Sequence, residues 1–174
     1  MREFQLFLKK EIQIGKINKM LSDELIKKTL ESAKTIAMVG VSSIKKEVST
    51  NIKRRPSTIV MKYMQEFGYK VIPVNPFAIG EIIHGETVVA NLKEISVPID
   101  IVDVFRPSKE APGIAEQAVN IETKVLWLQY GIQNEEAEKI VNGANIHYVA
   151  NKCIKQEYQK LFQKMSPVFP VLKT

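Results

Sequence analysis

Short apolar runs alternate with amphipathic segments along most of the chain. The runs are rich in aliphatic and β-branched residues, which is typical of strands buried on both faces. Strands are therefore expected over 35–39, 69–76, 100–105, 124–129 and 146–150, with a short edge strand at 88–89. Between these runs apolar residues recur with the helical period, and helices are expected to begin near Ser22, Pro56, Pro112, Asn134 and Ile154. The capping-box spacing of 91–94 predicts one further short helix.

Strands and helices alternate about five times in this pattern. Such alternation predicts an α/β fold, in which a parallel sheet of about five strands is covered by helices on both faces. Ligands bind to these sheets at the carboxyl ends of the strands, near the point where the strand order reverses. The residues expected at those ends are mostly polar or turn-forming, and they are Gly40, Val41, Ser42, Asn75, Pro76, Phe105, Arg106, Gln129, Gly131, Asn151 and Lys152.

The turn after the first strand has the residues that a phosphate site needs. Gly40 can adopt backbone angles closed to other residues, so a ligand can approach the main chain. Ser42 and Ser43 follow it, and then Lys45 and Lys46. Turns of this kind bind phosphate through backbone N–H groups and the positive end of the next helix. Taken alone, the turn is equally well explained as the end of a strand.

The length and composition describe one globular domain with short appendages. The chain has 174 residues, of which 45% are hydrophobic and 25% charged. Residues 1–20 fit neither the helical nor the strand period and are expected to form an N-terminal extension. The domain is expected over 21–165, followed by a C-terminal tail over 166–174. No apolar run reaches the roughly 18 residues that cross a membrane.

Cysteine and histidine are rare in this chain. The single cysteine, Cys153, cannot form an internal disulfide, and the N-terminus lacks the cleavage site of a signal peptide, so a cytoplasmic location is expected. One cysteine and two histidines cannot build a Cys/His zinc site, although carboxylates could in principle complete a weaker one. No metal site is predicted.

The chain is basic, with a net charge of +6 that is concentrated in the first 28 residues and in 45–55. A basic balance favours an anionic partner, such as nucleic acid, an acidic membrane surface or a phosphorylated small molecule. Most charge runs, however, are simply solvated surface. The aromatic residues lie in apolar runs and are not interleaved with the basic ones, which disfavours a nucleic-acid-binding module.

Dinucleotide binding fits these residues poorly. An NAD site needs three glycines in the first turn and an acidic residue at the end of the second strand. This chain has one glycine in that turn, and its second strand ends in Asn75 and Pro76. The basic segment suits a ligand with more phosphate charge, so NADP remains an alternative on charge alone. Asn75 can hydrogen-bond a ribose or an adenine edge.

Several of these segments together resemble a known family. They are 36–42, 55–57, 68–76, 100–106, 125–131 and 151–153. In this order and spacing they are similar to the small stand-alone CoA-binding proteins, which resemble the N-terminal CoA-binding domain of the succinyl-CoA synthetase α subunit. The resemblance covers roughly 22–163, and it implies a Rossmann-like fold with coenzyme A as the cofactor.

The resemblance also implies where each part of CoA would lie. The phosphates would lie at Gly40, Val41 and Ser42 and along the loop that runs from Ser43 to Arg55. The adenosine and the pantetheine arm would lie beside the ends of the later strands. For the adenosine the implied residues are Asn75 and Pro76, for the pantetheine path Phe105, Arg106, Gln129 and Gly131, and Asn151 and Lys152 complete the expected site. The loop over 43–56 is longer and richer in lysine than is usual in the family, and the first 20 residues have no counterpart there.

Residues for catalysis are few. His84 and His147 have no evident partner by spacing, and Asp103 lies within an apolar strand, where a hydrogen-bonded core role is expected. Cys153 begins a helix, where a thiolate would be stabilised, but a small buried residue at a turn explains it better. The sequence therefore predicts a protein that binds CoA or acyl-CoA without catalysis of its own. The alternatives are an NADP- or nucleotide-dependent enzyme and a nucleic-acid-binding module, and a homo-oligomer or a protein partner is left open.

Overall fold

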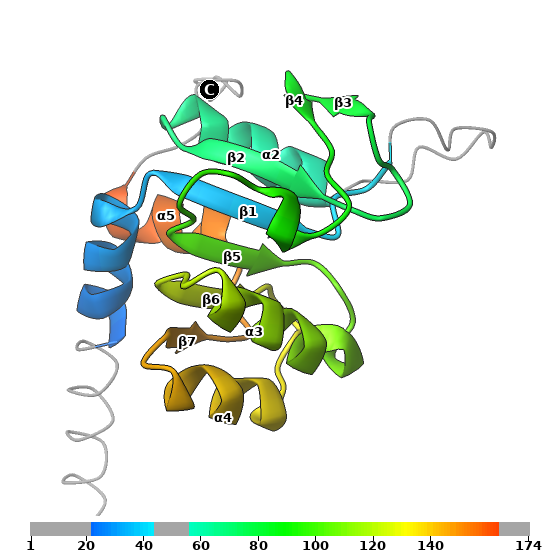
Figure 1. The fold of residues 1–174 in the computed structure, drawn as a ribbon. Coiled ribbons are helices and arrows are strands. Elements are labelled where there is room, and N and C mark those ends of the chain that lie inside the picture. Colours follow the sequence, from blue (N-terminus) through cyan, green and yellow to red (C-terminus); the bar gives the residue numbers. More distant parts are fainter. Residues whose placement is uncertain (1–21, 44–55, 164–174) are drawn as a thin grey trace, which may run out of the picture.

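The computed structural model describes residues 22–43 and 56–163, which form a five-stranded sheet between two layers of helices (Figure 1). All four neighbouring pairs of strands in this sheet are parallel. In spatial order the strands are β2 (Lys70–Val74), β1 (Thr35–Val39), β5 (Ile101–Val104), β6 (Val125–Leu128) and β7 (His147–Val149). The Rossmann-like α/β fold expected from the sequence is therefore confirmed.

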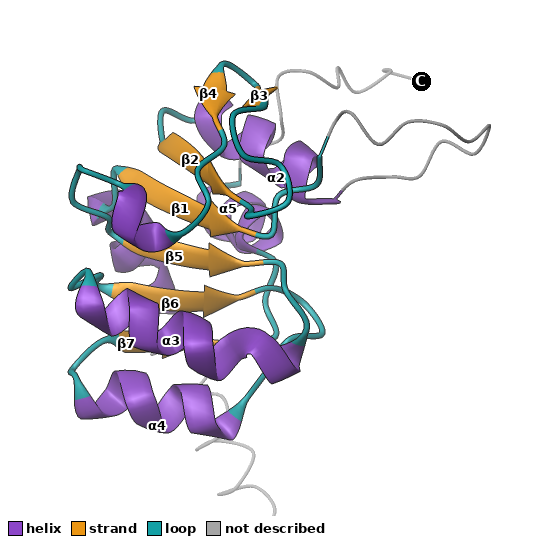
Figure 2. Cartoon of the chain, turned by 45° about the vertical axis from the view of Figure 1, so that its right-hand side comes forward, coloured by secondary structure: helices purple, strands orange, loops and turns teal. Residues whose placement is uncertain are grey.

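Helices cover both faces of the sheet, and the strand residues alternate between them (Figure 2). A helix over 22–32, α2 (Pro56–Glu66) and α5 (Ile154–Phe162) cover one face, and α3 (Ala111–Asn120) and α4 (Glu135–Gly143) cover the other. In β1, for example, Met38 packs toward the first layer and Ala37 toward the second, because successive side chains of a strand point to opposite faces. Helices cover the sheet on both faces, which explains why its strands are mostly apolar.

The helix boundaries follow the predicted capping signals. The Asn134 side chain accepts a hydrogen bond from the Ala137 N–H at 2.9 Å and caps α4. The Asn91 side chain caps the 3₁₀ helix η1 (Leu92–Glu94) in the same way, and the Glu94 carboxylate accepts the Ala90 N–H at 3.0 Å. A second 3₁₀ helix, η2 (Ser108–Glu110), leads directly into α3. These caps fix where the connections leave and enter the sheet.

The connection from β2 to η1 differs most from the expectation. It contains a small antiparallel hairpin of β3 (Ile82–Ile83) and β4 (Glu86–Thr87), where only loops and a strand at 88–89 are expected. His84 and Gly85 both have positive φ, as a two-residue hairpin turn requires. The expected strand at 88–89 is reduced to a single bridge between Val89 and Val74.

The helical period of the sequence places Leu25 and Ile59 on the buried faces of their helices, but the structure exposes both side chains. Leu25 and Ile59 each have 46% of their surface exposed, because they lie at the edge of the face that each helix buries. Residues 1–20, the basic segment 45–55 and the tail after 163 lie outside the described residues, and so do the domain boundaries predicted there. Within the described part of the chain, no helix is long and apolar enough to cross a membrane.

Candidate functional site

The strand order reverses between β1 and β5. From β1 the chain crosses to β2 on one side, and it later returns to β5 on the other side of β1. The two connections therefore diverge at the carboxyl ends of β1 and β5, where α/β sheets leave a crevice. Two hydrogen bonds hold the strands together up to this edge: the Gly40 N–H donates to the Val74 carbonyl and the Phe105 N–H to the Val39 carbonyl, both at 2.8 Å.

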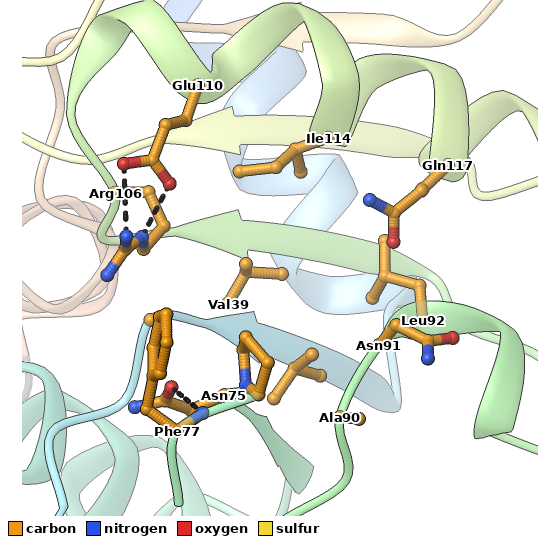
Figure 3. Close-up of a pocket in the computed structure, with 13 residues that line it drawn as sticks. Val39, Asn75, Phe77, Ala90, Asn91, Leu92, Arg106, Glu110, Ile114 and Gln117 are labelled. Carbon is orange, nitrogen blue, oxygen red and sulfur yellow. Dashed lines mark hydrogen bonds and ion pairs between the residues drawn. The ribbon is translucent and has the colours of Figure 1, made fainter.

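A pocket of about 460 Å³ opens at this crevice (Figure 3). Its apolar surface comes from strand residues, from η1 and from α3, and its polar groups lie around that surface. The lining residues are Val39, Gly40, Val74, Asn75, Pro76, Phe77, Ala90, Asn91, Leu92, Arg106, Glu110, Ile114 and Gln117. Pockets that hold small ligands or cofactors usually have volumes of roughly 300–1,000 Å³ and an apolar lining with few polar groups. This pocket has the size and the composition of such a site.

Gly40 makes room for Arg106 at the mouth of the pocket. It has a φ of +91°, which L residues with a side chain rarely adopt. A Cβ placed on it would lie 2.8 Å from Cδ of Arg106 and 3.2 Å from the carbonyl carbon of Phe105. Glycine is therefore required here both by the backbone angle and by the close passage of the Arg106 side chain.

Arg106 and Glu110 form a bidentate ion pair beside Gly40. Arg106 Nε lies 2.8 Å from Glu110 Oε2, and Nη2 lies 3.0 Å from Oε1. Both side chains are about one-third exposed (35% and 36%), so the pair is open to solvent on one side. A guanidinium has five N–H donors, and this pair leaves the Nη1 end outside it. The geometry presents an oriented cation at the pocket wall.

Asn75 ties the turn after β1 to the turn after β2. Its Nδ2 donates to the Val41 carbonyl at 2.8 Å, and its Oδ1 accepts the Phe77 N–H at 2.9 Å. The second bond is the side-chain-to-backbone contact of an Asx turn. Asn75 therefore fixes the pocket wall as well as lining it, and the aspartate or glutamate of an NAD site is absent from this position.

The N-terminal turn of α2 meets the turn after β1. The Ser57 side-chain oxygen accepts the Ser42 N–H at 3.0 Å, and the two serine hydroxyls are 3.3 Å apart. Ser57 is the second residue of α2, so the positive end of that helix lies at this turn. Ser43 donates to Glu81 Oε1 at 2.6 Å and ties the turn to the residue before the hairpin. The expected arrangement of a glycine turn beside a helix N-terminus is present.

The structure brings some expected site residues into the pocket and places others further along the same edge of the sheet. Gly40, Asn75, Pro76 and Arg106 line the pocket, whereas Val41, Ser42 and Ser43 lie in the adjoining turn. The others follow the ends of β5, β6 and β7. Phe105 packs partly into the core, Gln129 is buried, the Gly131 N–H donates to Asn151 Oδ1 at 2.8 Å, and Lys152 Nζ lies 3.7 Å from Glu157 Oε1. Arg55 lies outside the described residues.

Apart from the strand residues Val39 and Val74, seven lining residues were not among the site residues expected from the sequence. They are Phe77, Ala90, Asn91, Leu92, Glu110, Ile114 and Gln117. They come from the turn after β2, from the entry to η1, and from η2 and α3. One signal in the sequence points to part of this wall, since the capping box at 91–94 predicts the short helix η1 to which Leu92 belongs.

The ionisable groups considered for catalysis lie away from the pocket lining. Asp103 is fully buried, and burial raises its pKa to about 7 even though Gln129 Nε2 donates to its Oδ1 at 2.7 Å. Burial also raises the pKa of the Cys153 thiol and lowers that of His147. Among the described residues no group of three or more His, Cys, Asp or Glu side chains could hold a metal ion.

Comparison with known proteins identifies the family. Residues 34–159 match the CoA-binding domain family, so this chain is a member of that family. It is 42% identical over 130 residues to the uncharacterized protein YneT of Bacillus subtilis, an alignment that spans 75% of this chain and 89% of the relative.

Solved structures show the same fold. A protein from Thermus thermophilus is 36% identical with a TM-score of 0.71, over 80% of this chain and 98% of that one. A hypothetical protein from Pyrococcus horikoshii is also 36% identical with a TM-score of 0.71, over 80% and 92%. The dinucleotide-forming acetyl-coenzyme A synthetase 1 of Ca. Korarchaeum cryptofilum shares the fold at 18% identity with a TM-score of 0.52, over 68% of this chain and 26% of the synthetase.

Proposed function

We propose that this protein binds coenzyme A or an acyl-CoA at the carboxyl ends of its parallel strands, without catalysing a reaction itself. The observation that carries the proposal is the pocket at the strand reversal, which brings Gly40, Asn75 and Arg106 together in one lining. Membership of the CoA-binding domain family supports this choice of ligand.

The nucleotide end of CoA fits the pocket best. An adenine ring needs an apolar slot with polar groups at its edges, and the side chains of Val39, Leu92 and Ile114 provide the apolar surface. The carboxamides of Asn91 and Gln117 lie at the far end of the pocket from Arg106 and can hydrogen-bond polar groups of a ligand that reaches that end (Figure 3).

The phosphates of CoA fit beside Gly40. The glycine lets them approach the backbone, and the N-terminal turn of α2 supplies N–H groups with a favourable dipole. Arg106 adds a guanidinium that is already oriented by Glu110. From here the pantetheine arm would run along the ends of β5, β6 and β7, past Gln129, Gly131, Asn151 and Lys152.

The absence of catalysis is part of this proposal. Asp103 is enclosed in the core, where it accepts a hydrogen bond from Gln129. Burial raises the pKa of the Cys153 thiol and lowers the pKa of His147, and neither residue lines the pocket. The single cysteine leads us to infer a cytoplasmic location as well.

A ligand screen tests the proposal. Thermal unfolding is measured with CoA, acetyl-CoA, NADP and ATP at matched concentrations. A ligand at 100 times its dissociation constant stabilises the fold by about 2.7 kcal/mol, which raises the melting temperature by roughly 5–11 °C in a domain of this size. We expect CoA and acetyl-CoA to give this shift. A larger shift with NADP, or no shift with CoA, would reject the assignment.

A further inference from the structure

We propose that the Phe77 ring is the platform on which the adenine of CoA stacks. Phe77 lies two residues after Asn75 in the turn that follows β2, and it lines the pocket. The inference rests on the proposed function and names the residue that recognises the base. It was not among the site residues expected from the sequence.

Phe77 is unusually exposed for a phenylalanine, with 74% of its surface accessible. Single exposed apolar side chains are common on protein surfaces, so exposure alone says little. Ile79 and Ile82 in the same connection are 62% and 63% exposed, but neither lines the pocket. Phe77 therefore differs from these neighbours because its exposed ring borders a ligand-sized cavity.

The backbone that carries the ring is held in place. The Phe77 N–H donates to Asn75 Oδ1 at 2.9 Å, and the Ala78 N–H donates to the Asn75 carbonyl at 3.1 Å. Asn75 is itself bonded to the Val41 carbonyl, and Ala78 is buried with 3% exposure. The turn is thus anchored on both sides of Phe77. A ring on a fixed backbone loses little conformational freedom when a ligand binds to it.

The position of the ring matches the expected path of the ligand. In Figure 3 Phe77 and Arg106 lie at the same end of the pocket, Phe77 on the turn that follows β2 and Arg106 after β5, where it pairs with Glu110. A nucleotide with its phosphates beside Gly40 and Arg106 would bring its base into the space next to this ring. Aromatic side chains stack on every base through its π-face, and each such contact contributes appreciably to affinity.

Four variants separate stacking from other roles of Phe77. Affinity for CoA and for adenosine 3′,5′-bisphosphate, its nucleotide half, is measured by calorimetry on the full chain. Phe77→Tyr keeps an aromatic face, Phe77→Leu keeps apolar volume without the face, and Phe77→Ala removes both. Ile82→Ala is the matched control, because Ile82 is similarly exposed but lies outside the pocket lining.

We expect Phe77→Ala and Phe77→Leu to weaken the binding of both ligands by about 5- to 100-fold. Phe77→Tyr and Ile82→Ala should stay within about twofold of the unmodified protein. Full affinity in Phe77→Leu would overturn the inference, and so would a loss for CoA that spares the nucleotide half, since the ring would then contact the pantetheine arm. If Phe77→Ala and Ile82→Ala both bind CoA normally, the exposed residues of this connection serve another partner and the inference is wrong. Failure of the unmodified protein to bind CoA would instead reject the proposed function.

Discussion

Cδ of Arg106 passes so close to Gly40 that a Cβ on the glycine would lie 2.8 Å from it. This contact joins the turn after β1 to the end of β5, the two strands between which the strand order reverses. Gly40 meets two separate requirements for glycine in this turn. It has the positive φ, and it leaves room for the Arg106 side chain.

Replacing Gly40 with alanine should reduce both stability and CoA binding. The φ of +91° costs an alanine about 1–3 kcal/mol, and the Cβ displaces Arg106 from the phosphate position. We expect at least a tenfold loss of CoA affinity by calorimetry. Gly68→Ala is the matched control, because Gly68 has a φ of +92° but no atom within 4 Å of its added Cβ. It should lose similar stability and keep its affinity. Equal loss of affinity in both variants would show that Gly40 acts through stability alone.

Arg106→Ala should weaken CoA binding without greatly changing stability. A charge-assisted hydrogen bond contributes about 1.5–3 kcal/mol, which corresponds to roughly 10- to 150-fold in affinity. The ion pair with Glu110 is one-third exposed, so its loss should cost at most about 1 kcal/mol of folding free energy. Lys109→Ala removes a neighbouring exposed charge outside the pocket lining and serves as the control. The CoA affinity of both variants is measured by calorimetry at low and high salt. Equal losses of affinity in Arg106→Ala and Lys109→Ala would mean that net charge, and not the position of Arg106, determines binding.

The buried Asp103 carboxyl should make the protein less stable as the pH rises through neutrality. Burial raises its pKa in the folded state from 3.8 to about 7, so the folded protein holds the proton more tightly than the unfolded chain does. This stabilisation is complete below about pH 4 and is lost as the pH rises toward 7. At about 1.4 kcal/mol per pKa unit the loss reaches up to about 4 kcal/mol.

The variant Asp103→Asn keeps an oxygen that can accept the hydrogen bond from Gln129 and removes the titration. Urea unfolding at about pH 5 and about pH 8 should show a smaller difference in stability for this variant than for the unmodified protein. Identical pH slopes for the two proteins would mean that Asp103 does not titrate in this range.

Asp100 should make the protein less stable as the pH falls, whereas Asp103 makes it less stable as the pH rises. Burial alone would raise its pKa, but hydrogen bonds from Lys124 and from the N–H groups of Lys34 and Thr35 lower it from 3.8 to about 2. Its stabilisation is present above about pH 4 and is lost as the pH falls toward 2. Because Lys124 is 70% exposed, we expect a loss of about 1–2 kcal/mol. In acid unfolding, the variant Asp100→Asn should not show this loss of stability. An acid transition that is the same in the variant and the unmodified protein would contradict the prediction.

The fold was predictable because each strand of the main sheet is buried on both faces. The residues of β1 and β6, for example, read as continuous apolar runs that stop where polar turns begin. The hairpin of β3 and β4 was missed because two-residue strands have no detectable period. Leu25 and Ile59 were misplaced because helical periodicity locates a face without locating its edge.

The site was only partly predictable, because strand ends can be located in a sequence but the paths of the longer connections cannot. Gly40, Asn75 and Arg106 directly follow strands, and the parallel sheet brings such positions together. Asn91, Ile114 and Gln117 reach the same pocket from connections whose path over the sheet depends on packing. Phe77 adjoins a predicted residue, but its exposed ring gives no signal in a sequence, where phenylalanine usually indicates the core.

Binding of CoA in the pocket beside Gly40 can be followed residue by residue through backbone amide signals in NMR spectra during a titration with CoA. We expect saturable shifts that cluster at Gly40, Asn75, Phe77, Asn91 and Arg106 and fade toward the first helix and α4. The contradictory result is an absence of shifts, or shifts concentrated at the separate cavity where Leu25 and His147 lie between the first helix and β7.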